Sequence, residues 1–315
     1  MKIEPITPFE PILTESLPTG DNWVAQIKWD GVRMLTYFDG NEVRLVNRKL
    51  NDRTLQYPEF LDLSRYCDAT SVILDGEIIA FDSNKPSFHE IMKRDRIRKK
   101  QSIPLAVNQT PVTYMFFDVL FLNGSWVTEK PLRERQELLE QIITPLPNVQ
   151  VVQNFQDAYG LYEVMKQHQM EGIVCKDLSS SYLMKGKDKR WQKKKIFHDL
   201  LAVVGGVTLR HGIVNAVLLG LYDESGNFIY IGHAGGGKLT NQDWRALTET
   251  IKPLVTTNRP FHNQPERGKD AIWIKPKLVM KVQFMEWTTG LTMRHPTIQA
   301  IVNASLLDCT FSQNR

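Results

Sequence analysis

The chain has 315 residues, of which 42% are hydrophobic and 23% charged, so it is a globular protein long enough for two cored domains. Its formal charge of only +4 means that a nucleic-acid partner must be argued from local clusters of cations. The three cysteines, Cys67, Cys175 and Cys309, form no Cys-x-x-Cys pair, which argues against a disulfide framework and a structural zinc site. No stretch reaches the ~18 to 20 apolar residues of a membrane span and no signal peptide is evident, so we expect a cytoplasmic protein without membrane contact.

The first half of the chain alternates short β-rich runs with turns rich in Gly, Asn and Asp, a pattern typical of antiparallel sheet. Apolar residues recur at helical spacing in Pro131–Ile143 and Asp157–His168, which predicts two helices. The strands that we predict are Trp23–Trp29, Val32–Phe38, Glu42–Asn47, Ser71–Leu74 and Ile78–Phe81.

From about Leu200 the sequence again indicates short strands, with one helix at Gln242–Leu254 between them. Several short strands with one intervening helix are typical of a small barrel of the oligonucleotide-binding (OB) type. We therefore predict an α+β protein with two domains, 1–197 and 198–315. The strands of the second domain are Leu201–Val207, Ile213–Tyr222, Phe228–Gly232, Ile272–Ile274 and Leu278–Trp287.

The string Lys28-Trp29-Asp30-Gly31-Val32-Arg33 is the most informative motif. Within one short hairpin it would place a lysine amine, a turn that glycine permits and a guanidinium able to bind phosphate. Covalent nucleotidyl transfer requires this combination, because the amine is the nucleophile. The alternative is structural, since Asp-Gly between apolar residues is also a common hairpin turn.

Two further motifs place a carboxylate beside a glycine at the edge of an apolar strand, where the charge can face a cleft. Glu77 follows Asp75-Gly76, and Glu171 precedes Gly172. Oxygen ligands from separated strands suit Mg²⁺, which keeps several waters and bridges to phosphates. The alternative is that both are solvated residues at strand ends.

Aromatic and basic residues complete the pattern. Phe117 lies in an aromatic-rich strand and could stack on a base, although such residues are usually core. Cations crowd into residues 93–100 and 185–195; the first cluster is equally consistent with a solvated face and with phosphate contact. In the second, strand alternation would aim Trp191, Lys193 and Lys195 to one side, toward the cleft of Lys28.

In order and rough spacing, these motifs resemble the nucleotidyltransferase motifs of ATP-dependent DNA ligases, most closely the stand-alone or end-joining ligase modules of bacteria. Similarity to the OB domain of that group extends it over essentially the whole chain. The resemblance implies an adenylation domain with an ATP-grasp-like fold in front of an OB-fold, DNA-binding domain. The segments that carry it are Lys28–Arg33, Asn47-Arg48, Asp75–Glu77, Phe117-Asp118, Glu171–Lys176 and Trp191–Lys195, then Leu200–Gly206, Gly220–Tyr222, Trp273–Pro276, Leu278-Val279, Phe284–Trp287 and Arg294–Pro296.

By that resemblance, Lys28 is the residue that ATP adenylates, with Lys193 and Lys195 gripping the α-phosphate as catalytic cations. Phe117 would stack on adenine, Glu77 would contact the ribose or a metal, and Glu171 would hold Mg²⁺ (or Mn²⁺). The other residues implied in nucleotide binding are Gln26, Arg33, Arg48 and Lys176, and those implied in DNA binding are Arg33, Arg48, Lys185, Lys187 and Arg190.

One family motif is missing. An Arg-x-Asp-Lys string that orients pyrophosphate should follow Arg294-His295-Pro296, but residues 300–305 contain no cation. Self-adenylation is therefore the step most in question: either Lys275, Lys281 or Arg294 substitutes, or the enzyme loads AMP slowly and seals pre-adenylated ends better.

The resemblance implies a monomeric enzyme that seals 3′-OH/5′-phosphate breaks in nicked or broken double-stranded DNA, in repair, replication or recombination. It leaves open whether a Ku-like end-binding protein recruits the chain. Two alternatives stay open as well. An RNA ligase or capping-type nucleotidyltransferase would share the lysine motif, and a non-catalytic end-binding protein would keep the basic clusters without the chemistry.

Overall fold

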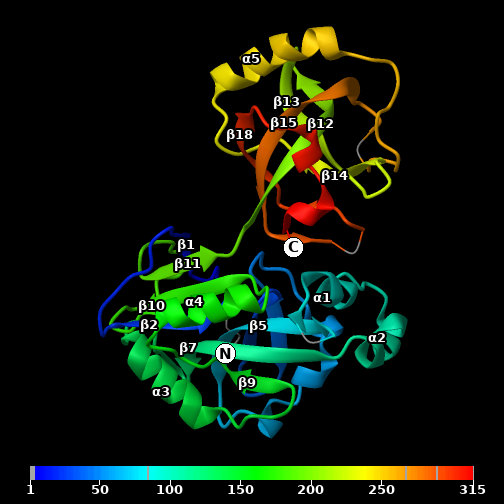
Figure 1. Cartoon of the computed structure of the whole chain (residues 1–315). Helices are drawn as coiled ribbons and strands as arrows, with labels where there is room; N and C mark the ends of the chain where they lie inside the picture. The colour runs from blue at the N-terminus through cyan, green and yellow to red at the C-terminus, as the bar shows by residue number, and fades with distance from the viewer. Residues whose placement is uncertain (1–3, 84, 267, 289, 315) are drawn as a thin grey trace. The chain divides into compact units, whose positions relative to one another are not determined.

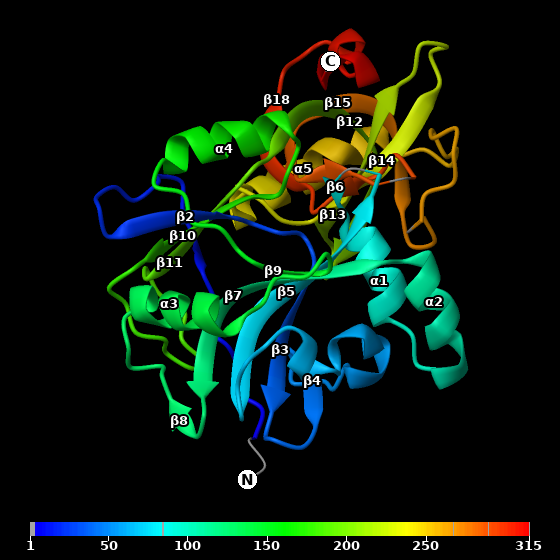
Figure 2. The same cartoon turned by 90° about the horizontal axis from the view of Figure 1, so that it is seen from below.

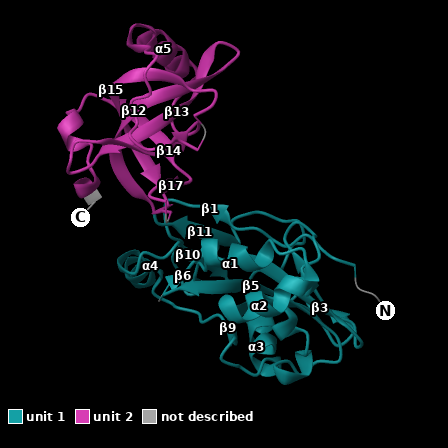
Figure 3. Cartoon of the chain, turned by 90° about the vertical axis from the view of Figure 1, so that its right-hand side faces the viewer, with its two compact units in different colours: residues 1–196 teal, residues 197–315 magenta. Residues whose placement is uncertain are grey.

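A computed structural model describes residues 4–83, 85–266, 268–288 and 290–314. The chain divides into two compact units, Met1–Ile196 and Phe197–Arg315 (Figure 3). Each unit has its own hydrophobic core. No helix in the described ranges is both long and apolar enough to cross a membrane.

The first unit is built on a large, mainly antiparallel sheet, seen in Figures 1 and 2. Helix α3 (Leu132–Ile142) packs on β7, and α1 (Phe88–Asp95) packs on β5 and contacts the short α2 (Ile103–Gln109). The sheet order is β4 (Val43–Asn47), β3 (Val32–Phe38), β5 (Val72–Asp82), β7 (Val112–Leu122) and β8 (Ser125–Trp126), with β6 (Lys85–Pro86) beside β5 and β9 (Val149–Val151) parallel to β7.

A smaller sheet completes this unit. Helix α4 (Ala158–Gln167) packs against its strands β10 and β2. Short β1 runs parallel to β11, and the other pairings are antiparallel. The order is β1 (Ile12–Leu13), β11 (Trp191–Lys195), β10 (Gly172–Asp177) and β2 (Trp23–Ile27).

The predicted hairpin around Asp30-Gly31 is wrong. Strand β2 pairs with β10 and β3 pairs with β4 and β5, so the two strands flanking the motif belong to different sheets. The linker between them crosses from one sheet to the other, and a Cβ at Gly31 would lie 2.3 Å from the Ile78 carbonyl oxygen. Glycine is required there for close packing and not for a two-residue turn.

Two predicted strand breaks are also wrong. The charged residues Asp75 and Glu77 interrupt the apolar pattern, yet β5 runs continuously from Val72 to Asp82. Strand β15 likewise continues from Ile272 to Phe284 through Pro276, with a register irregularity in its pairing to β12 (His198–Arg210). Asp75 is tolerated inside the sheet because a buried arginine neutralises it.

The second unit is an antiparallel sheet in which α5 (Asn241–Ile251), capped by Thr240 and Asp243, packs on β13. Its edges meet: the Ile298 amide donates to Gly236, and the Lys238 amide donates to Ile298, both at 2.8 Å. This contact makes the sheet barrel-like, as an OB-type domain requires. The order is β14 (Phe228–Ala234), β13 (Ile213–Tyr222), β12 (His198–Arg210), β15 and β18 (Thr297–Val302), and a separate pair joins β16 (Glu286–Trp287) and β17 (Met293–Arg294).

Gly172→Ala should strongly destabilise the first unit. Gly172 has φ +137°, and an added Cβ would lie 2.1 Å from the Lys194 carbonyl oxygen, so both the backbone conformation and the β10–β11 pairing oppose a side chain. We expect a loss of more than about 2 kcal/mol in the free energy of unfolding, measured by chemical denaturation. Gly236→Ala is the matched control because a Cβ there meets open space. Equal effects of the two substitutions would contradict this account.

Candidate active site

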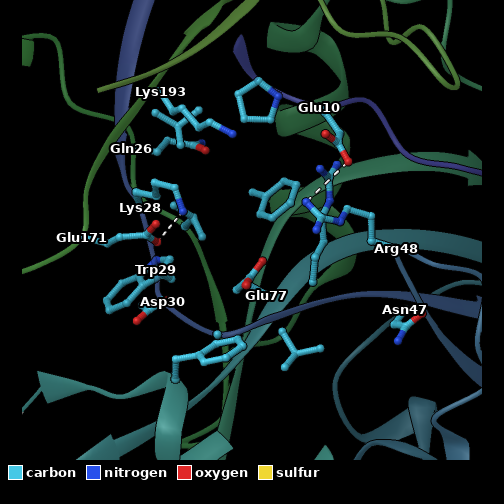
Figure 4. A pocket seen from close by; sticks show the side chains of 18 of the residues that line it. Glu10, Gln26, Lys28, Trp29, Asp30, Asn47, Arg48, Glu77, Glu171 and Lys193 are labelled. Atoms are coloured by element: carbon cyan, nitrogen blue, oxygen red, sulfur yellow. Dashed lines mark hydrogen bonds and ion pairs between the residues drawn. The ribbon is translucent and has the colours of Figure 1, made fainter. Parts of the chain in front are cut away.

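A cavity of about 640 Å³ lies in the first unit, between residues of both sheets. Figure 4 shows Lys28 and Glu171 on one wall and Arg48 with Glu10 on the other, with Glu77 between them. Its lining includes most of the predicted site, namely Gln26, Lys28, Arg33, Arg48, Glu77, Phe117, Glu171, Lys176, Lys193 and Lys195.

Lys28 stands directly after β2, and its backbone amide donates to the Gly172 carbonyl at 3.0 Å. Its ammonium forms an ion pair with the buried Glu171 carboxylate, whose other oxygen lies 3.0 Å from Lys195 Nζ. Burial alone would raise the pKa of Glu171, but the two lysines outweigh it and lower the pKa below its ordinary value. One carboxylate thus holds two amines at the cavity wall.

Glu77 lies within β5, where it is the register partner of Arg33 on β3. It is not the strand-end residue expected from the sequence. Burial raises its pKa to about 8; Lys28 and Arg33 oppose the shift, and Glu171 and Asp30 add to it. The pKa values of Glu77 and Glu171 are therefore shifted in opposite directions from the same ordinary value.

The residues present fit a divalent cation. Glu77 and Glu171 offer carboxylate oxygens from two different sheets, and the cavity leaves room for waters and phosphate oxygens, which Mg²⁺ prefers. A buried carboxyl with a raised pKa is also the kind of group that a cation would ionise. Within the described ranges, no group of three or more His, Cys, Asp or Glu could hold a metal. Substrate oxygens would have to complete the coordination.

Arg33 lines the cavity but has protein partners on every guanidinium nitrogen. Nε and Nη2 donate to Asp75 at 2.9 and 2.6 Å, and Nη1 donates to the Phe9 carbonyl at 2.6 Å. Tyr182 donates to the same carboxylate at 2.8 Å. Burial disfavours the charge on Arg33, but Asp75 outweighs it and raises the pKa above its ordinary value. A phosphate contact by Arg33 stays a prediction, since a phosphate would compete with Asp75.

Lys176 is the most unusual side chain of the site. It is 2% exposed, and its Nζ lies 4.1 Å from the ring centre of Phe117 and 4.0 Å from that of Trp191. Within the described structure this nitrogen has no hydrogen-bond partner. Burial lowers its pKa to about 7. A buried amine without a partner at a cavity wall is poised to donate to a ligand.

The remaining predicted residues fall into two groups. Gln26 is buried and already donates to Asn154 at 2.8 Å, whereas Arg48 is half exposed and lies 3.4 Å from Glu10. Burial, helped by Lys28 and Lys195, lowers the pKa of Lys193. The predicted DNA-binding residues that do not line the cavity are Lys185, Lys187 and Arg190, which come before β11.

Several residues that line the cavity are not among those predicted from the sequence motifs. Glu10 had no motif to mark it, although it provides the ion-pair partner of Arg48. Phe88, Met92 and Asp95 also line the cavity from α1, and their i, i+4, i+7 spacing was an available signal. The dense charges around them obscured this helical pattern.

Two protein-family models match the chain. Residues 1–195 match the model described as ATP dependent DNA ligase domain, and residues 210–302 match the ATP dependent DNA ligase C terminal region. The chain belongs to the ATP-dependent DNA ligase family. The resemblance drawn from its motifs is confirmed, as is the pairing of a nucleotidyltransferase domain with an OB-like domain.

Curated relatives of this ligase-family chain include a DNA ligase of Thermococcus fumicolans, 27% identical over 96% of the chain and 57% of the relative. DNA ligase 2 of Methanosarcina acetivorans is 30% identical over 86% of the chain and 50% of the relative. The chain thus spans about half the length of the curated relatives it matches.

Among solved structures, the ligase domain of M. tuberculosis LigD is 25% identical with a TM-score of 0.55, covering 98% of this chain and 99% of that one. A structure from work on the minimal Lig E DNA ligases is 18% identical with a TM-score of 0.60, covering 89% and 93%. The second likeness concerns the fold alone. Both extend over nearly the whole ligase-family chain.

Lys176→Met should stabilise the protein at neutral pH, because methionine fills the same space between two aromatic rings without burying an unpaired amine. We expect a gain of about 1 to 3 kcal/mol in the free energy of unfolding. The pKa of Lys176 is about 7 in the folded protein and 10.5 for an ordinary lysine, so the unfolded chain binds an extra proton between these pH values and wild-type stability rises with pH across that window.

The gain should therefore be largest near pH 7 and shrink toward pH 10, as measured by denaturant titration at several pH values. Lys166→Met, at an exposed position of α4, is the matched control and should show no such dependence. A gain that stays constant over this range would contradict the buried, titrating amine.

Proposed function

We propose that this chain is an ATP-dependent DNA ligase that seals 3′-OH/5′-phosphate breaks through a Lys28-AMP intermediate. One observation carries the proposal: the Lys28 amine faces a cavity whose lining includes Glu77, Glu171, Lys193, Lys195 and Phe117. Family membership supports the same reaction. In this proposal, residues 1–197 form an ATP-grasp-like adenylation domain, and residues 198–315 form an OB-fold DNA-binding domain.

Adenylation begins with proton loss from Lys28, because an ammonium has no lone pair. A free lysine has a pKa near 10.4, so presenting the neutral amine at pH 7 costs about 4.6 kcal/mol. Lys193 and Lys195 line the cavity with Lys28 and would neutralise the charge that builds on the α-phosphate. Glu171 pairs with Lys28, so this ion pair has to separate before the amine attacks.

In the first step, Lys28 Nζ forms a bond to the α-phosphorus of ATP, and the bond to pyrophosphate breaks. An oxygen of the DNA 5′-phosphate then attacks the same phosphorus, and Lys28 leaves. Finally, the 3′-hydroxyl loses its proton and attacks the 5′-phosphorus, and AMP is expelled. A Mg²⁺ or Mn²⁺ ion bound by Glu77 and Glu171 would neutralise phosphate charge during these displacements.

The geometry also supports a role for Lys176 and Phe117 in binding adenine. The ring of Phe117 borders the cavity, and base stacking on an aromatic ring contributes about 1 to 3 kcal/mol. The Lys176 amine lies 4.1 Å from the centre of that ring, and Lys176 lines the same cavity. Gln26 lines the same cavity and would contact the base edge.

Incubation with α-labelled ATP is the deciding experiment. Wild-type protein should carry a labelled band that Lys28→Ala abolishes and that is sensitive to added chelator. A protein that is labelled by ATP but not by GTP, and that seals nicked DNA but not nicked RNA, fits the proposal. Preferential RNA sealing or labelling by GTP would instead indicate the RNA ligase or capping alternative. Absence of any band would favour a non-catalytic end-binding protein.

Lys275 is the cation that we infer replaces the missing Arg-x-Asp-Lys motif. Of the three candidates, Arg294 pairs with Glu286 at 2.6 Å and Lys281 lies 3.8 Å from Asp199, whereas Lys275 is exposed and makes no ion pair among the described residues. Lys275→Ala should slow self-adenylation about a hundredfold or more, since removing one group that stabilises transition-state charge costs about 3 to 4 kcal/mol. Sealing of a pre-adenylated nick should be much less affected.

The control is Lys281→Ala, which also removes an exposed cation from β15. Quenched-flow labelling with ATP measures the rate of self-adenylation, and sealing of a pre-adenylated nick measures the rate of the last step. Equal slowing of both steps by Lys275→Ala would refute a role in pyrophosphate orientation.

In the cell, we infer that the chain acts as a monomer in the cytoplasm, on nicked or broken duplex DNA, in repair, replication or recombination. Recruitment by a Ku-like end-binding protein would suit the end-joining role.

A further inference from the structure

The basic run at residues 93–100 is uniform in sequence but not in structure. Arg94 is fully buried: it donates to Glu59 at 2.9 Å and to the Thr110 and Gln56 carbonyls at 2.9 and 2.7 Å. Lys93 pairs with Glu90 on the same helix. Those two cations serve the fold. The remaining four, Arg96, Arg98, Lys99 and Lys100, are exposed, and residues 96–100 are called the basic loop here.

The backbone of the basic loop is held in place. The Gln56 side chain donates to the Ile97 carbonyl at 2.6 Å, and the Ile97 amide donates to the Arg94 carbonyl at 3.1 Å. Arg98 donates to the Asp95 carbonyl at 3.0 Å. A loop fixed in this way presents its cations at lower entropic cost than a disordered run of the same composition would.

The acidic groups around the basic loop are already neutralised. Asp95 pairs with Arg53 at 3.1 Å and accepts a hydrogen bond from Tyr57, while Glu90 and Glu59 hold Lys93 and Arg94. Within the described ranges, Arg96, Lys99 and Lys100 make no ion pair. The loop therefore carries an uncompensated positive charge into solvent.

The position of the basic loop connects it to the cavity. Phe88, Met92 and Asp95 line the cavity from one face of α1, and the loop continues directly from the end of that helix. Arg48 and Arg53 also line this cavity, and Arg53 forms an ion pair with Asp95. The basic loop therefore begins one residue after Asp95, which lines the cavity.

We propose that the basic loop binds the phosphate backbone of duplex DNA beside the break. This inference rests on the proposed function and adds a surface that the ligase motifs do not include. Exposed lysines and arginines on a fixed loop suit sequence-independent contact with phosphates, and they release counterions when they bind. Such contacts position the duplex without reading its bases.

A triple variant with Arg96→Ala, Lys99→Ala and Lys100→Ala tests the proposal. Its affinity for a fluorescently labelled nicked DNA duplex is measured by anisotropy over a series of NaCl concentrations. We expect binding about tenfold or more weaker at low salt, and a slope of log affinity against log salt that is less steep by ~0.9 for each lost contact. The matched control, Arg65→Ala with Lys130→Ala and Lys166→Ala, removes the same charge from exposed positions outside the cavity lining and should bind like wild type.

Labelling with α-labelled ATP separates the possible failures. The adduct forms without DNA, so a labelled triple variant has a folded adenylation unit, and weaker DNA binding is then due to the loop. If the labelled triple variant binds DNA like the control at every salt concentration, the inference about the loop is overturned while the proposed function stands. If wild-type protein neither labels nor binds nicked DNA, the proposed function itself fails.

Discussion

The buried pair between Arg33 and Asp75 is the interaction on which the site depends. It joins neighbouring strands β3 and β5 of the large sheet, and the spare guanidinium nitrogen reaches the Phe9 carbonyl in the segment that leads to β1 of the small sheet. Tyr182 adds a third hydrogen bond to the carboxylate. Removing one partner of a buried ion pair typically costs about 3 to 5 kcal/mol, because the other charge is left uncompensated.

A second buried pair repeats this design. Arg135 of α3 binds Asp118 of β7 with two hydrogen bonds at 2.8 and 2.9 Å and also reaches the Ser180 carbonyl, which belongs to the segment after β10. The two pairs leave no room for either aspartate to contact a ligand. They explain why charged residues occur in central strands of the large sheet.

Two glutamates that line the cavity differ in pKa. Glu171 lies between two lysine amines and has a lowered pKa, whereas burial raises the pKa of Glu77 to about 8. Burial has the opposite effect on Lys176, which is a base, and lowers its pKa to about 7. Burial holds Glu77 and Lys176 away from their preferred charged forms, so a ligand that pairs with them would relieve a cost that the folded chain already bears.

The sequence by itself determined most of the segments that line the cavity and the antiparallel character of both units, because the motif order and the alternation of apolar residues are local properties. It could not determine which strands pair. Lys28–Arg33 was interpreted as a hairpin, yet its flanking strands find partners far along the chain in different sheets. Charge patterns had the same limit. Arg33 and Arg94 resemble their exposed neighbours in sequence, but contacts with Asp75 and Glu59 bury them. Only the tertiary structure brings such partners together, since burial and ion pairing depend on residues 30 or more positions away.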